Sequence, residues 1–471
     1  MSEEKRSEYR DEEAVEGPAT DAERRPVEQL SLSRRDFIKL GTASGVAVVA
    51  GTGAAATPRV AEAVRTSARI VIVGGGAGGL TVAARLSHLL AGARITLLEP
   101  NETHHYQPGY TLVGTGIYDK DEVLAETGEY VPGGVEWVRS GAAGFDPEAS
   151  TVTTTAGDTL EYDYLVVATG CELRFDWIEG MSRDLVGREG IGSNYAGAEG
   201  AAATWEQVQR FMARGGEGVF TTANTPIKCA GAPLKATFLT EDLVRREGTR
   251  DQASFNYFQN GDRLFSVDIY HDLASRRFEE KGVGVHYHHE LKAIDPGRRR
   301  ATFVRPQEGD EVEVDYDYIH VTPPMSAPKV VRESDLAWQE GSHAAGGWME
   351  VDQYTLRHRR YDNVFGIGDV VGTPIGKTAA TVRGHAPVVA DNLVATIQEK
   401  EMPARFDGYT SCPLITGVGS AALVEFNYEL EQDSSLPFFD QTDDRWMWWQ
   451  VKVRGVKPLY YQMLRGRLLK T

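Results

Sequence analysis

Residues 68–100 read ARIVIVGGGAGGLTVAARLSHLLAGARITLLEP, and this stretch carries the strongest structural signal in the chain. It predicts a buried strand at Ile70–Val73, a helix at Leu80–Leu90 and a second parallel strand at Ile95–Leu98, which together form a βαβ unit. The turn before the helix has the pattern G-x-G-x-x-G, made by Gly74, Gly76 and Gly79. These glycines permit a tight turn, let the backbone approach a pyrophosphate and let the helix pack closely on the strand.

An acidic residue completes this unit. Glu99 follows the second strand, and a carboxylate at that position accepts hydrogen bonds from ribose hydroxyls and disfavours a 2′-phosphate. Because strand, helix, second strand and acid occur in register, the stretch predicts a site for FAD or NAD rather than NADP. We therefore predict an α/β fold built from Rossmann-like dinucleotide-binding domains.

Length and composition limit the classes of function. A chain of 471 residues with 41% hydrophobic residues and 50 glycines has room for two or three folded domains. A net charge of -18 argues against a nucleic-acid partner. Three cysteines are too few for a disulfide framework. The run from His286 to His289 is not accompanied by a cysteine or acid cluster, so no metal site is predicted.

The N-terminal region has two compositionally distinct parts. Residues 1–30 are charged and poor in aliphatic side chains, which predicts an acidic disordered tail. Residues 31–66 contain Arg34-Arg35, a weakly apolar run and Ala61-Glu62-Ala63, the layout of a twin-arginine export signal. The apolar run is too short and too rich in glycine for a membrane-spanning helix. We therefore expect export and a peripheral location on the outer face of the cytoplasmic membrane.

One sequence pattern occurs twice along the chain. Phe145-Asp146-Pro147 and Ile294-Asp295-Pro296 each open a predicted three-stranded insertion, which indicates two Rossmann-like domains. The second domain has a strand at Val219–Thr222, but no G-x-G-x-x-G follows it, and Cys229 stands in that region instead. The second domain is therefore expected to lack a nucleotide cradle.

These patterns divide the chain into segments. After the tail and the signal, the predicted segments are residues 67–190 (FAD-binding domain, first part), 191–320 (second Rossmann-like domain without nucleotide motif), 321–400 (return to the FAD-binding domain) and 401–471 (C-terminal quinone and membrane region).

Further flavin contacts are predicted where strands end. A strand ending in Gly-Asp places a carboxylate next to the ribityl chain, while the glycine admits the phosphate arm. A helix that begins near position 377 points its positive end at the flavin pyrimidine. His385 in this helix is a candidate proton carrier. The residues concerned in cofactor binding are Thr169, Gly170, Gly368, Asp369, Lys377 and Thr378.

The C-terminal region has two open interpretations. Residues 445–469 mix Trp, Tyr, Leu, Arg and Lys, as helices at a membrane surface do. The alternative is a terminal helix that packs its aromatic side chains on the domain. In the first interpretation, the walls of a quinone pocket or the membrane anchors are Trp448, Trp449 and Tyr460.

Several motifs together resemble those of the sulfide:quinone oxidoreductases, in particular the branch that includes the mitochondrial enzyme. The resemblance extends from Ala68 to the C-terminus. The motifs that carry it are His105-Tyr106-Gln107-Pro108, Ile191-Gly192-Ser193-Asn194-Tyr195, Thr225-Pro226-Ile227-Lys228-Cys229-Ala230-Gly231-Ala232-Pro233, His320-Val321-Thr322-Pro323-Pro324-Met325, Phe365-Gly366-Ile367-Gly368-Asp369 and Tyr409-Thr410-Ser411-Cys412-Pro413-Leu414.

The resemblance implies a glutathione-reductase-like fold and an FAD-dependent oxidation of sulfide to sulfane sulfur. Electrons would pass to a membrane quinone, and the sulfur to an acceptor that the sequence does not identify. It further implies that Cys412 takes the incoming sulfur as a persulfide and that Cys229 is the thiolate beside the flavin. Lys228 either lowers a thiolate pKa or is a plain surface lysine. Homo-oligomerisation is left open.

Cys171 lies outside the matching motifs. In a related branch an additional cysteine is linked to the flavin, but a small residue in a tight turn is the favoured interpretation here. Three alternative functions remain. They are a flavoprotein sulfide dehydrogenase that reduces a c-type cytochrome, a type II NADH dehydrogenase, which needs the nucleotide motif missing after Thr222, and a flavin-binding sulfur carrier or sensor.

Overall fold

The computed structural model describes residues 63–435 and 440–467. The predicted acidic tail and almost all of the predicted twin-arginine signal lie outside the described residues.

The first sheet contains the βαβ unit predicted from the sequence. Five parallel strands have the order β22-β11-β2-β4-β7. They are β2 (Arg69–Val73), β4 (Arg94–Leu98), β7 (Val135–Val138), β11 (Tyr164–Val167) and β22 (Val364–Gly366). Helix α2 (Ala77–Leu89) begins three residues earlier than expected, directly after the glycine turn. Because β22 follows more than 190 positions after β11 in sequence, the chain returns to complete this sheet.

The second sheet repeats this arrangement. Its five parallel strands have the order β13-β20-β14-β15-β16. They are β13 (Ile191–Gly192), β14 (Gly216–Thr221), β15 (Ala253–Phe258), β16 (Gly284–His286) and β20 (Tyr318–His320). Buried aromatic rings from the sheet pack against helices α4 (Gly197–Arg214), α5 (Ala232–Glu247) and α6 (Asp268–Lys281).

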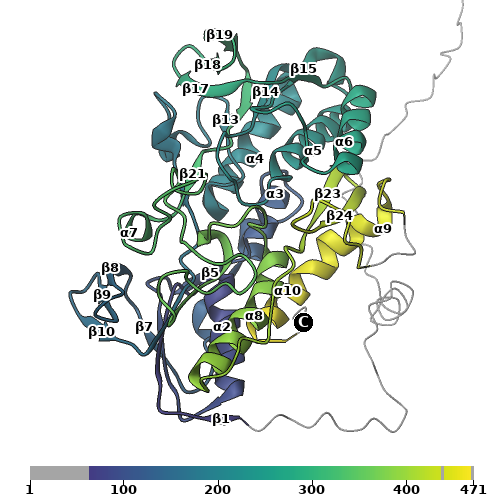
Figure 1. Cartoon of the computed structure of the whole chain (residues 1–471). Coiled ribbons are helices and arrows are strands. Elements are labelled where there is room, and N and C mark those ends of the chain that lie inside the picture. Colours follow the sequence, from purple (N-terminus) through teal and green to yellow (C-terminus); the bar gives the residue numbers. More distant parts are fainter. Residues whose placement is uncertain (1–62, 436–439, 468–471) are drawn as a thin grey trace, which may run out of the picture. The chain divides into compact units, whose positions relative to one another are not determined.

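Each sheet has the three-stranded antiparallel insertion that the repeated sequence pattern predicts. The first consists of β8 (Ala142–Asp146), β9 (Thr151–Thr154) and β10 (Thr159–Glu161). The second, at the top of Figure 1, consists of β17 (Glu290–Asp295), β18 (Arg300–Arg305) and β19 (Asp310–Asp315). Two parallel sheets with matching insertions confirm the predicted α/β fold class.

The remaining elements join or cover these sheets. The short strands are β1 (Val64–Arg65), β3 (Leu90–Ala91), β5 (Thr103–His105), β6 (Leu124–Glu126), β12 (Glu172–Leu173) and β21 (Met325–Ser326). The short helices are α3 (Tyr110–Val113) and α7 (Lys329–Arg332). A long helix, α8 (Ala379–Ile397), packs beside α2 (Figure 1).

The C-terminal region adds a hairpin and a helical segment. The hairpin consists of β23 (Thr410–Gly417) and β24 (Ser420–Phe426). The helical segment consists of α9 (Trp446–Gln450), a π-helix (Val451–Gly455) and α10 (Val456–Leu464). Within the described ranges, none of the helices combines the length and apolarity that crossing a bilayer requires.

The predicted aromatic anchors of this region are buried. Trp448 and Trp449 are only 1% and 7% exposed, because they pack with apolar residues of β23 and β24. Tyr460 is 5% exposed, and its hydroxyl lies 2.8 Å from His104 Nε2. These three residues therefore cannot be surface anchors, and the packed interpretation of the terminal helices is correct for them. Composition did not distinguish the two cases, because both use aromatic side chains.

Candidate active site

The glycine turn after β2 has the close contacts that a dinucleotide turn needs. Gly74 has a φ of +104°, and a Cβ atom on Gly79 would lie 1.8 Å from the carbonyl oxygen of Gly74. By contrast, a Cβ on Gly76 would meet no heavy atom within 4 Å. Gly76 is the N-cap of α2, and no side chain caps the helix there. The turn thus leaves backbone N–H groups at the start of α2 beside open space, as a bound pyrophosphate requires.

Glu99 lies beside this turn. Its Oε2 atom accepts a hydrogen bond of 2.6 Å from the N–H of Gly75, and its Oε1 atom accepts from the backbone and side chain of Asn101. The carboxylate is therefore fixed at the end of β4, where ribose hydroxyls are expected in this fold. Contact with a ribose remains a prediction.

The residues after β11 and β22 approach the same edge of the first sheet. The side-chain hydroxyl of Thr169 is buried, and within the described part of the chain it has no hydrogen-bond partner. Gly368 donates its N–H to His385 Nδ1 at 3.3 Å, while His385 Nε2 is buried and likewise unpartnered among the described residues. Unpartnered buried polar atoms are rare in folded proteins, so these two atoms indicate room for a polar ligand.

Asp369 and Lys377 lie close together in this region. Burial raises the pKa of Asp369, although the nearby Lys377 opposes this shift. Burial lowers the pKa of Lys377 to about 8, and its Nζ atom donates to the carbonyl oxygens of Asp369 and Val371 at 2.6 and 3.0 Å. The ammonium of Lys377 is therefore held by backbone oxygens and remains available to balance negative charge on a ligand.

Helix α8 begins two residues after Lys377. Its N-cap is Thr378, whose hydroxyl accepts a hydrogen bond of 3.1 Å from the N–H of Thr381. Burial lowers the pKa of His385 to about 3, so this histidine is neutral near pH 7. A neutral imidazole carries one N–H, and because Nδ1 accepts from Gly368 that proton lies on Nε2. A role of His385 as a proton carrier remains a prediction.

These residues together fit FAD. The turn provides N–H groups for the pyrophosphate, Glu99 is placed for the ribose, and Thr169 and His385 offer unpartnered polar atoms. Asp369, Lys377 and Gly170 would then line the flavin end of the site.

The two candidate redox cysteines lie side by side. Cys229 and Cys412 are separated by 183 positions in sequence, yet their Sγ atoms are 3.1 Å apart. Cys229 lies in the turn before α5 with a φ of +49°, a left-handed conformation that is uncommon for cysteine. Cys412 lies on β23. Both thiols are partly exposed, so a small reactant can reach them.

A buried lysine, not predicted from the sequence, bridges the two sulfur atoms. Lys235 lies in the second turn of α5 and is 2% exposed. Its Nζ atom is 3.2 Å from Cys229 Sγ and 2.8 Å from Cys412 Sγ. Burial by itself lowers the pKa of a lysine, but the two sulfurs outweigh it and raise the pKa of Lys235 above its ordinary value. Lys235 is therefore a fixed positive charge at the cysteine pair.

A second buried lysine comes from the C-terminal region. Lys452 lies in the π-helix, is 3% exposed and donates to the carbonyl oxygen of Pro108 at 2.7 Å. Burial and the neighbouring Lys235 lower its pKa to about 8, although both cysteines oppose the shift. Single π-helical turns often occur at functional sites.

These charges act differently on the two thiols. The hydrogen bond from Cys229 lowers the pKa of Cys412, as do the charges of Lys235 and Lys452. The pKa of Cys229 is raised by its hydrogen bond to Cys412 and by burial. The negative charge of the reduced pair therefore lies mainly on Cys412.

Two other residues predicted near the chemistry, Lys228 and Cys171, make no hydrogen bond to Cys229 Sγ or Cys412 Sγ among those that the described residues form. Lys228 directs its Nζ atom to Gln107 Oε1 at 2.8 Å, and its backbone N–H donates to Met325 Sδ at 3.2 Å. Cys171 Sγ lies 3.9 Å from Met325 Sδ, and burial raises its pKa to about 11. An apolar neighbour and a raised pKa fit the small-residue interpretation of Cys171.

The edge of the second sheet has a cavity of about 280 Å³. It lies where β14 and β20 end, and its lining includes Thr222, Asn224 and Thr322. No glycine-rich turn borders it, because residues 222–231 follow β14 in place of such a turn.

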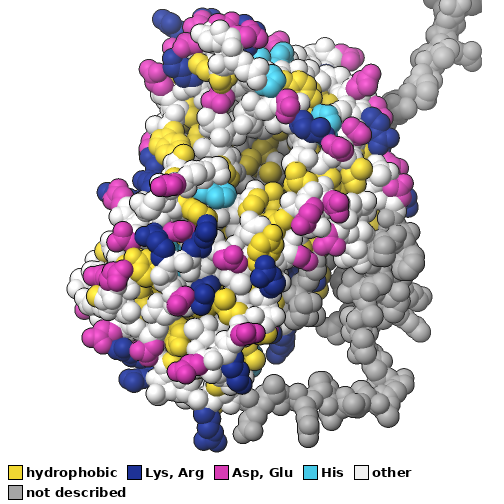
Figure 2. Space-filling model, in the orientation of Figure 1, with side chains coloured by type: hydrophobic (Ala, Val, Ile, Leu, Met, Phe, Trp, Pro, Cys, Tyr) yellow, Lys and Arg dark blue, Asp and Glu magenta, His cyan; other side chains and the backbone are white. Residues whose placement is uncertain are grey.

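On the face in Figure 2, apolar side chains gather around a hollow near the middle. The described residues include no group of three or more side chains suited to holding a metal ion.

Comparison with known proteins defines the class and then the family. The sequence profile of the pyridine nucleotide-disulphide oxidoreductases matches residues 68–216, so this segment is a domain of that class. The mitochondrial sulfide:quinone oxidoreductase of Dictyostelium discoideum is 38% identical over 401 residues, 85% of this chain and 86% of the relative. That of Mus musculus is 35% identical over 433 residues, 91% and 92% of the two chains. The chain therefore belongs to the sulfide:quinone oxidoreductase family.

A solved structure shares the fold. The sulfide:quinone oxidoreductase of Aquifex aeolicus superimposes with a TM-score of 0.70 at 22% identity, covering 85% of this chain and 92% of that one. The predicted family is confirmed, and with it the assignment of the chain as an FAD-dependent oxidoreductase.

Proposed function

We propose that this protein oxidises sulfide to sulfane sulfur at Cys229 and Cys412 and passes the electrons through FAD to a membrane quinone. The observation that carries this proposal is the pair of sulfur atoms 3.1 Å apart with the Lys235 ammonium in contact with both. Such a pair can form a disulfide, accept a sulfur atom and stabilise the thiolate that is released.

The first step is a thiol-disulfide exchange in which hydrosulfide attacks the oxidised pair at the sulfur of Cys412. The bond between the two cysteines breaks, a new S–S bond forms on Cys412 as a persulfide, and Cys229 leaves as a thiolate. Lys235 supports this step because its ammonium is 3.2 Å from Cys229 Sγ. Since the reduced pair places its charge mainly on Cys412, attack at Cys229 is the competing assignment.

Turnover requires two further transfers. A nucleophilic acceptor removes the outer sulfur from the persulfide and leaves a thiol on Cys412. The dithiol then closes to a disulfide and releases two electrons and its protons. Bound FAD supplies the two-electron carrier between this dithiol and quinone. The sum is oxidation of one sulfide, reduction of one quinone and transfer of one sulfane sulfur.

The proposed site of action is a membrane surface reached by twin-arginine export. Support for export comes from Arg34-Arg35 and Ala61-Glu62-Ala63 in the sequence. Support for a surface contact comes from Trp446 and Leu459, which are 52% and 43% exposed on α9 and α10. Exposed aromatic and aliphatic side chains near basic residues are typical of interfacial helices.

An anaerobic sulfide titration of the purified holoenzyme tests the proposed function. Sulfide should bleach the flavin absorbance, and a ubiquinone analogue should restore it without a cytochrome. Restoration by a c-type cytochrome alone would instead identify a sulfide dehydrogenase. NADH should leave the flavin oxidised, because the loop after β14 has no dinucleotide turn. Absence of bleaching by sulfide would contradict the proposal.

A further inference from the structure

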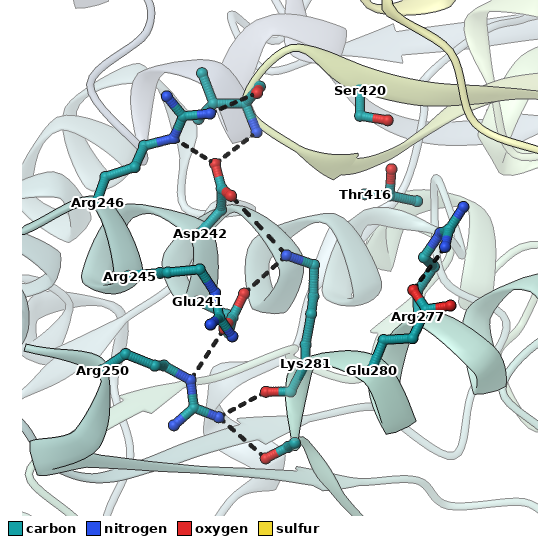
Figure 3. A network of polar contacts seen from close by, with 12 residues as sticks. Glu241, Asp242, Arg245, Arg246, Arg250, Arg277, Glu280, Lys281, Thr416 and Ser420 are labelled. Atoms are coloured by element: carbon teal, nitrogen blue, oxygen red, sulfur yellow. Dashed lines mark hydrogen bonds and ion pairs between the residues drawn. The ribbon is translucent and has the colours of Figure 1, made fainter. Parts of the chain in front are cut away.

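The turn of the β23–β24 hairpin is held by two charged side chains of α5. Asp242 Oδ2 accepts a hydrogen bond of 3.0 Å from the N–H of Val418, and Arg246 donates to the Val418 carbonyl oxygen at 2.9 Å. Arg246 also donates to Asp242 at 2.7 Å, so the two side chains orient each other (Figure 3). Both backbone hydrogen-bonding groups of Val418 are thus fixed by one helix. We call Asp242, Arg246 and Val418 the hairpin clamp.

The two strands beside the turn have a second anchor. Thr416 on β23 and Ser420 on β24 both donate hydroxyl hydrogen bonds to Asp444 Oδ2. Arg277 of α6 donates to the other oxygen of Asp444. Figure 3 shows Thr416, Ser420 and Arg277 on the α6 side of the hairpin. The turn is therefore held from α5 and from α6, which leaves the hairpin little freedom to shift.

Helix α5 connects this clamp to the cysteine pair. Cys229 precedes the helix, Lys235 is in its second turn, and Asp242 follows Lys235 by seven positions, so both side chains project from the same face. Seven residues of helix span about 10 Å. One rigid helix therefore carries the contacts to Cys229 at its start and the clamp near its end.

The clamp end of α5 is itself fixed. Glu241 is fully buried and pairs with Arg250 at 3.0 Å and with Lys281 of α6 at 2.8 Å. A buried carboxylate with several charged partners is costly to displace. Because α5 cannot move easily, the clamp transmits the position of α5 to the hairpin.

We propose that Asp242 and Arg246 are positioning residues that hold Cys412 against Cys229, so that the hairpin clamp sets how fast the dithiol closes. With Cys412 as the thiolate, closure forms one S–S bond, breaks the S–H bond of Cys229, releases one proton and passes two electrons to an oxidant, which is FAD in the proposed catalytic cycle. Its relevance to turnover rests on the proposed function, but closure itself can be measured without sulfide. Misplacing reacting atoms by about 1 Å costs up to roughly 100-fold in rate.

Disulfide closure by diamide in the reduced holoenzyme tests the clamp. The background variant is Cys171→Ser, which leaves the two relevant thiols. Asp242→Asn and Arg246→Met should each slow closure, and should each lower the effective concentration measured in glutathione redox buffers, by about tenfold. Arg246→Lys, which keeps a donor and a charge, should restore part of the rate. The matched control is Glu280→Gln, which breaks the 2.6 Å ion pair with Arg277 in the same network without touching Val418.

The outcomes separate positioning from general loosening. Slower closure in both clamp variants, with an unchanged control and an unchanged melting temperature, supports the proposal. Equal closure rates in all variants, or the same loss in Glu280→Gln, overturn it. If Asp242→Asn does not fold, the Arg246→Met variant provides the test, because the Arg246 side chain is exposed. If the clamp variants close more slowly but the native enzyme does not oxidise sulfide, the proposed role of the clamp is supported and only the proposed function is rejected.

Discussion

The units β2–turn–α2 and β14–loop–α5 occupy matching places in the two sheets. They differ in what lies beside the N-terminal end of the helix. In the first, three glycine residues, 74–76, separate strand and helix, and the start of α2 faces open space. In the second, residues 222–231 separate them, and the first N–H of α5, at Ala232, donates to the carbonyl oxygen of Cys229 at 2.7 Å. The helix start that we predict to bind a pyrophosphate in one unit lies beside Cys229 in the other.

This difference shows how one architecture can hold two kinds of anion. The positive end of a helix stabilises a phosphate or a thiolate by the same electrostatics. The short turn fits a pyrophosphate because it has no side chains there. The longer loop brings its own sulfur atom and, one turn farther along α5, its own cation, Lys235. The second unit therefore has Cys229 and Lys235 where the first has the glycine turn, which fits the redox role proposed for it.

The largest effect should come from removing a sulfur atom from the cysteine pair, which the second unit (Cys229) shares with β23 (Cys412). Cys229→Ser and Cys412→Ser should each reduce sulfide-dependent quinone reduction by about 10³-fold or more, because a hydroxyl cannot form the disulfide or the persulfide. FAD content should stay normal, since the first unit is untouched. The measurements are reduction of a ubiquinone analogue and the flavin spectrum.

Cys171→Ser is the matched control for these variants and should retain near-normal turnover. Trapping the persulfide by alkylation and mass spectrometry in the native oxidised protein, after one equivalent of sulfide, identifies which cysteine accepts sulfur, because only the intact pair forms the disulfide that sulfide attacks. Turnover that survives in Cys412→Ser would show that the second unit is not the reaction centre.

A smaller effect is expected from a methyl group placed at a glycine near the start of each helix, within α2 at Gly79 and at the N-cap of α5 at Gly231. Gly79→Ala should lower the free energy of unfolding by about 1–3 kcal/mol and release FAD, because its Cβ would overlap the Gly74 carbonyl oxygen. Gly231→Ala, just before α5, should change the unfolding free energy by less than about 0.5 kcal/mol, since its Cβ would lie 3.7 Å from Leu414. Thermal melting and FAD content after gel filtration measure both. Equal sensitivity at the two positions would mean that the loop is packed as tightly as the turn.

Removing the cation of the second unit should have a moderate effect. Lys235→Met should raise the pKa of Cys412 and slow its alkylation at pH 7 by about tenfold or more, because an ammonium 2.8 Å away favours the thiolate. Iodoacetamide kinetics between pH 5 and 10 measure this in the Cys171→Ser background. Lys228→Met is the control, since Lys228 contacts Gln107 instead. A pH profile that is unchanged in Lys235→Met would show that the helix start suffices.

The features of both units that short sequence motifs encode were predictable from the sequence. The glycine turn and Glu99 follow from the spacing of a βαβ unit. Cys229 and Cys412 followed from the motifs around them, although their 3.1 Å separation is a tertiary result. The repeated insertion was predictable because strand patterns recur after both Asp-Pro pairs.

The lysines and tryptophans of the site depend on burial, which composition does not reveal. Lys235 and Lys452 were missed because a lysine on a helix is usually solvated. A signal existed for Lys235, since it lies among Pro233, Leu234 and Ala236 at the start of a helix that follows a cysteine. Trp448 was predicted as a wall of a quinone pocket or a membrane anchor, and its burial argues against the anchor. Composition did not reveal this because packed and interfacial helices both contain aromatic side chains. The role as a pocket wall remains a prediction.

The smallest expected effect concerns Lys452, which reaches the second unit from the C-terminal region. Its pKa of about 8 means that it is protonated below pH 8 and loses its charge as the pH rises further. Lys452→Met should therefore slow alkylation of Cys412 by about threefold at pH 6.5, where the native ammonium favours the thiolate. Above about pH 9 the variant and the native protein should react at the same rate, since both then lack the charge. Stopped-flow alkylation across this range measures the difference, with Lys457→Met on α10 as the control. A rate difference that persists at high pH would show that Lys452 acts through its hydrogen bond to Pro108 and not through its charge.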